Sequence, residues 1–468
     1  MIWHIAKREL YDNLNSLRFA LATVLLFGLM LTNAIVHLRE HPVRIQKYHD
    51  AVTESLNRLR ARTDLYEIAQ WGPGNLYKKP SPLHFCAEGG DIFLSDRVNG
   101  EFVFWTTDDL RGFWQLLYLP ATLNSKNIRP DTIKVDWGFV IGYVLSLIAI
   151  LFTFDSISGE RERGTLRLML ANSVPRHTVL LGKFLGALIS ISVPFTLSVL
   201  MNLLVISTSN DVQLSTEAWS RLGIIFSIAL LYLCLFLALG LLVSSRVQQN
   251  AASLVTLLLM WVTFVVFMPS TLASIASGFS TPMTYDEFFE RRNQLHNELK
   301  DTYETRLQNT DELSAKKIQL GGEYVTDEAA QRERLSHEHL NQEHAQIQLA
   351  RSVTRISPVA IVQHLLEAFA GTGFERHRQF VENVQRYARE YREFVGDMDR
   401  ADPDSPHIIG VREGMSQKPI NPEAIPKFED TLSLSRDFNT AAVDLLLLVL
   451  FFLVFFSGAY LAFVRVEV

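Results

Sequence analysis

Cysteine is scarce in this 468-residue sequence, which contains only Cys86 and Cys234. Cys234 lies within a long apolar run and Cys86 in a polar region, so we expect no intrachain disulfide. A nucleotide-binding motif is also missing, because Gly182 and Lys183 are followed by Phe184 and the glycine spacing of a phosphate-binding loop is absent. We therefore expect no nucleotide hydrolysis by this chain.

Charged residues make up 20% of the sequence but are absent from six long stretches. Each stretch has 18 to 25 residues, enough for a helix to cross about 30 Å of hydrocarbon. One charge at a helix centre costs roughly 2.5–3.5 kcal/mol on insertion, so the pattern predicts an α-helical polytopic membrane protein rather than a large soluble one. The stretches are Phe19–Val36, Trp137–Phe154, Phe184–Thr208, Leu222–Ser245, Val247–Met268 and Leu445–Val464.

Ionisable side chains are also missing from the middle of these stretches, since Asp136, Asp155 and Asp444 lie at their ends. Ion-coupled carriers keep such groups near the membrane midplane, so their absence argues against self-powered secondary transport. Nothing in the sequence brings Ser, His and Asp together, and no catalytic residue is predicted.

Three histidines and two glutamates gather in the segment 337–344, where His339 and Glu343 are four residues apart. This pattern is interpreted either as a polar helix face or as a metal site. Because the order HExxH is not met in a charged, solvated segment, we expect the polar face and no metal.

The stretches divide the chain into spans and insertions, and cations indicate their orientation. From Ser156 to Lys183 there are five cations and two anions, so the positive-inside rule places this loop and both chain termini in the cytoplasm. Both insertions then lie outside. The net charge of −6 comes mostly from the insertions and does not suggest a nucleic-acid partner. The expected order is an interfacial helix at 1–17, spans at 18–37, 137–155, 179–208, 219–245, 247–274 and 440–464, a loop at 156–177, and insertions at 38–134 and 275–439.

The helix expected at 1–17 has one apolar face. Trp3, Ala6, Leu10, Leu14 and Leu17 recur at helical spacing. Lys7 and Arg8 lie elsewhere on the helix. Such a helix lies in the cytoplasmic interface of the membrane, or it merely caps the first span in the cytosol.

The first insertion is predicted to mix a helix at Ile45–Ile68 with turns and short strands in its Gly/Pro-rich part. The second is predicted to be mainly helical, with a hairpin turn at Gly321–Gly322 and a return helix at Leu335–Arg351. Further on, apolar residues recur every three or four positions, which indicates either packing within the domain or a seam against a second subunit. The seam consists of Phe380, Val384, Tyr387, Tyr391 and Phe394.

The loop 156–177 and its border resemble the signature of ABC-2-type transporter permeases. A cluster of charges at Glu160–Glu162 precedes Gly164–Leu166, an apolar helix, Pro175 and the Leu-Gly-Lys of Leu181–Lys183. The Lys7, Arg8 and Glu9 run is similar to the elbow helix before the first span of that family.

A second resemblance concerns the branch of these permeases that carries the DUF3526 domain. The segment Ile356–Arg392 is similar to the membrane-proximal part of that domain. The shared features are the Ser357–Pro358 start, the Ala370–Thr372 turn, and the His377 and Phe380 step.

The resemblance implies a type V exporter-like subunit with six spans, which pairs with a copy of itself or a paralogue in a bacterial inner membrane. It also implies two separate ATPase subunits that bind ATP and Mg²⁺, with no cofactor in this chain. The loop 156–177 would carry the coupling helix that docks on an ATPase. The implied coupling residues are Glu160, Arg161, Glu162, Arg163, Gly164, Thr165, Leu166, Arg167, Met169, Leu170 and Pro175.

Physical features of the loop agree with that role. Thr165 can cap a helix and Pro175 can end it. Leu166, Met169 and Leu170 form one apolar face, and Arg163 and Arg167 are spaced four apart for acidic partners. The other interpretation is a loop helix that lies on the bilayer surface.

We therefore predict the permease subunit of an ATP-driven exporter in contact with membrane lipids. The alternative is a mechanotransmission or docking subunit that acts on an extracytoplasmic partner without moving cargo. An intramembrane or periplasmic enzyme is a third hypothesis, and the sequence supports it least.

Overall fold

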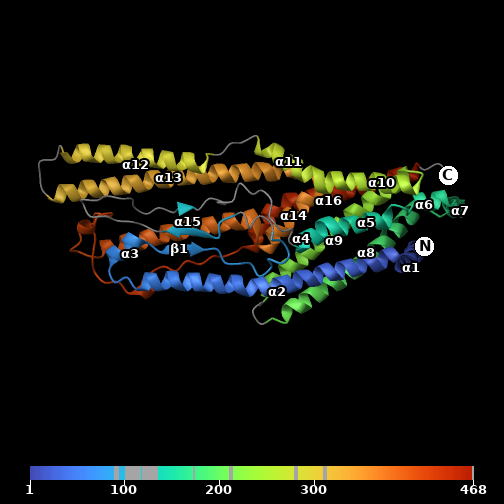
Figure 1. The fold of residues 1–468 in the computed structure, drawn as a ribbon, viewed down its shortest axis with the longest axis horizontal. Helices are drawn as coiled ribbons and strands as arrows, with labels where there is room; N and C mark the ends of the chain where they lie inside the picture. The colour runs from blue at the N-terminus through green and yellow to red at the C-terminus, as the bar shows by residue number, and fades with distance from the viewer. Residues whose placement is uncertain are drawn as a thin grey trace.

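The computed structural model is an elongated, mainly helical molecule (Figure 1). The transmembrane helices lie at one end, and long helices of the two insertions extend from them to the other. It describes residues 1–88, 94–100, 117–118, 135–171, 174–209, 214–278, 283–308 and 314–465.

Six helices are long and apolar enough to cross a membrane, which confirms the predicted number of spans and the fold class. Two of them contain a π-helical stretch, η2 (Val140–Leu145) and η3 (Val262–Phe267). The spans are α2 (Leu17–Arg60), the run α4 (Trp137–Phe139)–η2–α5 (Ser146–Thr153), α8 (Arg176–Ser207), α9 (Thr216–Arg246), the run α10 (Asn250–Trp261)–η3–α11 (Met268–Ser277), and α16 (Leu434–Val464).

The first span does not end at the membrane. Helix α2 continues through Pro42 to Arg60, so the span expected at 18–37 and the first insertion share one helix. A new helix, α3 (Leu65–Trp71), begins where the Asp64 carboxylate accepts a hydrogen bond from the Glu67 amide at 2.7 Å. This cap, rather than the membrane boundary, accounts for the break in the helix.

The first insertion mixes helix and sheet, as predicted. The strands β1 (Gly74–Tyr77), β2 (Arg97–Gly100) and β3 (Leu117–Tyr118) form an antiparallel sheet in the order β1-β2-β3. Gly74 pairs with Gly100, and Val98 pairs with Tyr118.

The second insertion is mainly helical, but the turn predicted at Gly321–Gly322 is wrong. Helices α12 (Tyr285–Gln308) and α13 (Ser314–Thr354) lie side by side, and both glycines are inside α13. A Cβ at Gly322 would lie 2.5 Å from Ile408 Cγ2, so this glycine allows close packing of the 408–414 loop. The predicted return helix at Leu335–Arg351 lies within α13.

The aromatic seam packs inside this chain. On α15 (Gly373–Arg400), Phe380, Val384, Tyr387 and Tyr391 are buried and Phe394 is partly buried. The Tyr391 hydroxyl donates to the Ile68 carbonyl at 2.9 Å, and the Tyr387 hydroxyl donates to the Pro426 carbonyl at 3.0 Å. Packing within the domain accounts for this pattern. Little of the surface of these side chains is left exposed for contact with a second subunit.

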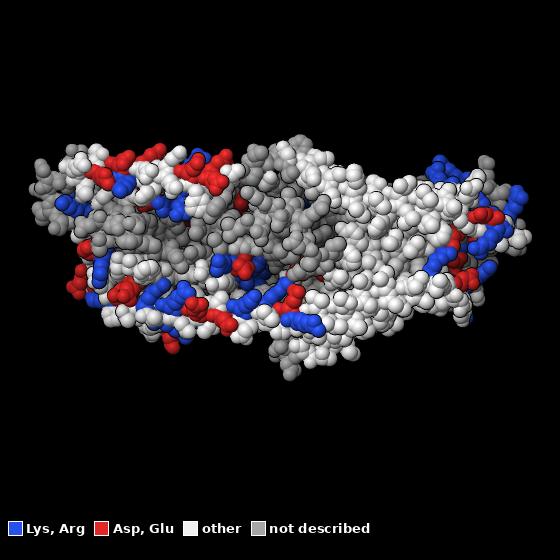
Figure 2. All heavy atoms as spheres, in the orientation of Figure 1, with Lys and Arg blue, Asp and Glu red and all other residues white. Residues whose placement is uncertain are grey.

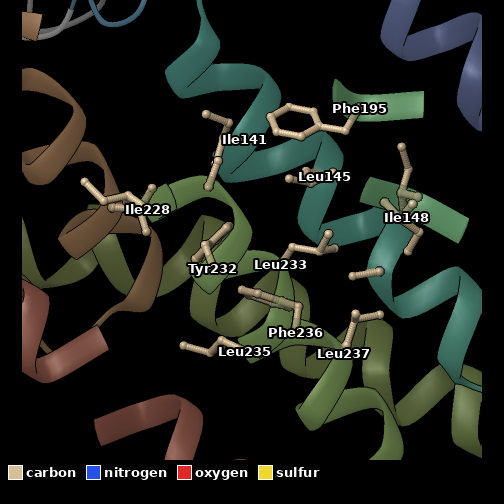
Figure 3. Packing of buried hydrophobic residues seen from close by; sticks show 14 of the residues in the cluster. Ile141, Leu145, Ile148, Phe195, Ile228, Tyr232, Leu233, Leu235, Phe236 and Leu237 are labelled. Carbon is tan, nitrogen blue, oxygen red and sulfur yellow. The ribbon is translucent and has the colours of Figure 1, made fainter. Parts of the chain in front are cut away.

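The membrane core is built around α9. Its Tyr232, Leu233 and Phe236 are buried in the same cluster as Leu145 and Phe195 of neighbouring spans (Figure 3). The absence of a side chain at one α9 position matters most, because a Cβ at Gly240 would lie 1.8 Å from Thr153 Oγ1 and 2.7 Å from Thr153 Cβ. Interiors packed this closely do not absorb an added methyl group without strain.

Gly240→Ala should therefore destabilise the protein by about 1–3 kcal/mol through overpacking, seen as a lower thermal midpoint in detergent. Gly223→Ala is the matched control on the same helix, because nothing lies within 4 Å of its added Cβ. That control should be neutral or slightly stabilising. Equal midpoints for the two variants would contradict the packing argument. Thr153→Ala should recover only part of the loss, because it removes the hydroxyl but keeps a Cβ 2.7 Å from the added methyl group.

Candidate functional site

The loop between the second and third spans forms two short helices at one end of the molecule. Helices α6 (Ser158–Glu162) and α7 (Thr165–Ala171) lie at the same end as α1 (Ile2–Leu14) and the end of α16 (Figure 1). Figure 2 shows that charged residues gather at this end and are nearly absent from the belt that separates it from the insertions. Charged side chains beyond an uncharged belt lie in water, so this end is the candidate site for contact with a soluble partner.

The helix predicted to begin at Thr165 and to end at Pro175 is shorter than expected. Gly164 has a φ of +75°, which separates α6 from α7, and the Thr165 hydroxyl donates to the Glu160 carbonyl at 3.2 Å. Helix α7 ends at Ala171, and Pro175 immediately precedes α8. The expectation that Pro175 ends the coupling helix is wrong, because its fixed φ suits the start of the next helix.

This break also separates two arginines that the sequence spaces four apart. Arg163 is the C-terminal cap of α6, whereas Arg167 lies within α7. They do not share one face of a continuous helix, although both are exposed.

A buried lysine holds α6 against two other helices. The Lys183 side chain is 2% exposed, and its Nζ lies 2.5 Å from Glu9 Oε1 of α1 and 2.8 Å from Glu160 Oε1 of α6. An ammonium group buried to this extent is stable only while its partners compensate its lost hydration. The Leu-Gly-Lys motif thus supplies the charge that joins α1, α6 and α8.

Further polar contacts fix α6 to the turn between α9 and α10. The Arg161 guanidinium donates to the Ser245 carbonyl at 3.1 Å and the Val247 carbonyl at 3.5 Å, at the C-terminal end of α9. This placement of a cation satisfies carbonyls that the helix end leaves unpaired. At the start of α10, the Asn250 amide donates to Glu162 Oε2 at 3.3 Å.

Helix α1 docks on small residues of α8. A Cβ at Gly182 would lie 2.7 Å from Ile5 Cβ, and a Cβ at Gly186 would lie 2.6 Å from Glu9 Cβ. One turn further on, the Asn13 side-chain amide donates to Ser190 Oγ at 3.1 Å. Small residues at this four-residue spacing let the two helices approach closely.

The predicted apolar face of α1 mostly points away from the protein. Trp3 is 63% exposed, Leu10 is half-buried, and Lys7 and Arg8 are exposed. Among the predicted apolar residues, Ala6 is buried. An apolar face left uncovered by the protein suits a helix in the membrane interface.

The exposed surface of α7 differs from the predicted one. Leu166 is 2% exposed and belongs to the main hydrophobic core, and Met169 is half-buried beside a cavity of about 270 Å³ that α1 also lines. The side chain of Leu170 lies outside the described part of the chain. Leu168 is 69% exposed, and it stands with Arg167 on the outer surface of α7. We did not predict Leu168, because the apolar spacing identifies a helix face but not which neighbour covers it.

The His/Glu segment lies on α13, away from this site. The ring of His339 stacks on Phe288 at 4.8 Å, and the ring of His344 meets Phe374 edge-on at 5.2 Å. Burial lowers the pKa of His339 and raises the pKa of Glu343. Within the described residues, no group of three His, Cys, Asp or Glu side chains is placed to hold a metal ion.

Comparison with known proteins assigns nearly the whole chain to one family. A profile of the family described as ABC-2 family transporter protein matches residues 3–468. Two relatives are each described as a probable ABC transporter permease protein NosY. The relative from Pseudomonas aeruginosa is 31% identical over 136 residues, which cover 28% of this chain and 48% of the relative. The relative from Stutzerimonas stutzeri is 29% identical over 137 residues, with the same coverage. The chain therefore spans about half the length of the curated relatives it matches.

Lys183→Met should destabilise the protein by roughly 3–5 kcal/mol, because it leaves Glu9 and Glu160 facing each other without a cation. Thermal unfolding in detergent measures this loss, and Lys7→Met on the exposed side of α1 is the control. Adding Glu9→Gln and Glu160→Gln to Lys183→Met should restore most of the stability. If Lys183→Met unfolds at the same temperature as Lys7→Met, the buried ion pairs do not hold these helices together.

Proposed function

Because this chain belongs to the ABC-2 family of transporter proteins, we propose that it is the membrane permease subunit of an ATP-driven exporter. ATP and Mg²⁺ bind to separate ATPase subunits, two for each pair of permease subunits, on the cytoplasmic side of a bacterial inner membrane. The excess of cations near the α6–α7 loop supports this orientation. The DUF3526 branch remains an assignment from the sequence of 356–392 alone.

The observation that carries the proposal is the contrast between α7 and α6. Helix α7 offers one exposed leucine and one exposed arginine to a soluble partner, as a helix that docks in a groove requires. Helix α6 is bound through buried polar contacts to α1, α8 and the α9–α10 turn. Movement of the ATPases against α7 would therefore reach several spans through α6.

Replacing the exposed residues of α7 should uncouple the ATPases. The double variant Arg167→Glu/Leu168→Glu loses one apolar contact and reverses one charge, so ATPase recovered with the purified permease should fall at least about tenfold. ATP turnover of the recovered complex should fall with it. Arg8→Glu is the control, because Arg8 is exposed at the same end of the molecule but lies on α1.

Leu166→Glu is not a suitable test of coupling, because burying a carboxylate in the core would unfold the segment. Full recovery of ATPase with the Arg167→Glu/Leu168→Glu variant would place the coupling surface elsewhere.

A second candidate function is mechanotransmission to an extracytoplasmic partner. The fifth span continues into α11, which packs on α13, and the α12–α13 pair presents a charged surface far from the membrane belt (Figure 2). A movement of the fifth span would then displace the pair relative to the rest of the insertions.

Spin labels can detect that displacement. In a Cys86→Ser/Cys234→Ser background, labels at Asn293 on α12 and Gln46 on α2 should change their separation when the complex binds ATP, if the subunit transmits force. A constant separation with and without ATP would overturn mechanotransmission and leave export as the proposal.

A further inference from the structure

A polar cavity lies where the insertions meet the last span. It has a volume of about 220 Å³, opens to the surface, and is lined mainly by residues of α13, α14 (Pro358–Ala370), α15 and α16. Its wall includes three arginines, Arg351, Arg355 and Arg378, and two carboxylates, Glu375 and Asp444, so it carries one net positive charge when its histidine is neutral.

Both carboxylates are already engaged by arginines. Arg355 donates from Nε to Asp444 Oδ1 at 2.6 Å and from Nη2 to Asp444 Oδ2 at 3.4 Å. Arg378 donates from Nε to Glu375 Oε1 at 2.6 Å. These bonds neutralise the two carboxylates, so the unbalanced positive charge belongs to the third arginine.

Arg351 is that third arginine. Its guanidinium carbon lies 5.9 Å from the centre of the Phe374 ring. Within the part of the chain that the structure describes, no carboxylate approaches its nitrogens within 4.0 Å. A cation–π contact orients a guanidinium but leaves its five N–H donors for another acceptor.

His364 also lines this cavity, and one of its ring nitrogens lacks a hydrogen-bond partner among the described residues. This nitrogen is Nδ1, and it is buried. Burial, followed by the charges of Arg351 and Arg355, lowers the pKa of His364 to about 3, so the ring is neutral. A buried polar atom without a partner costs free energy, and a bound acceptor would remove that cost.

The position of the cavity indicates where such an acceptor comes from. The charge-free stretch of α16 begins at Leu445, directly after Asp444, and the neighbouring Val443 and Leu446 are exposed apolar side chains. Ile356, beside Arg355, is an exposed apolar residue as well. The cavity therefore lies at the end of the charge-free stretch of α16, at the level of lipid headgroups.

We propose that this cavity binds a phosphoryl group, carried by an anionic phospholipid or present as free phosphate, between Arg351 and His364. The planar fork of Arg351 matches two phosphoryl oxygens, and His364 Nδ1–H donates to another. This inference is independent of the proposed coupling to ATPases.

The test uses the full-length protein in a neutral detergent, stripped of lipid. Binding of phosphatidylglycerol is measured by native mass spectrometry, and binding of inorganic phosphate by thermal shift. Arg351→Gln should weaken binding roughly tenfold or more, because a charge-assisted hydrogen-bonded contact is lost. Arg334→Gln is the matched control on α13, since Arg334 is exposed and does not line the cavity.

The two ligands separate the two sources of the phosphoryl group. Phosphatidylglycerol binding that depends on Arg351, without phosphate binding, supports a lipid headgroup, whereas Arg351-dependent binding of both supports a free anion. Arg351→Lys keeps the charge and should bind more tightly than Arg351→Gln, which distinguishes a lost contact from misfolding. Binding by neither ligand, or equal binding by Arg351→Gln and Arg334→Gln, would overturn the proposal.

Discussion

The ammonium group of Lys183 is the constraint on which the end of this membrane protein that contains α1, α6 and α7 depends. It is buried where a single charge is costly, so two carboxylates from other helices must remain beside it. This requirement places α1 along α8 and holds α6 at the start of the same span. The glycines of α8 allow it, because any side chain at Gly182 or Gly186 would push α1 away from the lysine.

A second buried ion pair holds the opposite end of the span bundle. Arg221 of α9 is buried and lies 2.7 Å from Asp437 at the start of α16, and it also donates to the Phe369 carbonyl of α14 at 3.3 Å. Gln379 of α15 donates to the same aspartate at 2.6 Å. The spans are thus tied by buried charges at both ends, and the apolar packing around α9 fills the length between them.

The sequence predicts the features that depend on composition, such as the spans. It does not predict the features that depend on which residues pack against one another. Six charge-free stretches predicted six spans, since charge inside the membrane is excluded whatever the tertiary fold. By contrast, Leu166 and Leu168 differ little in sequence, and only the position of α1 and the core decides that Leu166 is buried while Leu168 is exposed. Gly321–Gly322 indicated a turn because glycine favours turns, but the 408–414 loop needs Gly322 for close packing inside a helix. The sequence of the aromatic seam was compatible with packing within the domain and with packing against a second subunit. The fold decides for the first, because Ile68 and Pro426 lie against it.

The junction at Gly164 keeps α7 exposed while the helix remains in contact with the rest of the protein. Its positive φ turns the chain so that α7 leaves the direction of α6, which keeps Leu168 and Arg167 outside. Leu166, on the opposite side of α7, packs in the main hydrophobic core and so fixes this helix to the spans. A force on Leu168 would therefore press Leu166 against the core and pull on Thr165, whose hydroxyl is bonded to Glu160. Because Glu160 also holds Lys183, the same residue that keeps the buried charge stable would carry that force into α8 and α1.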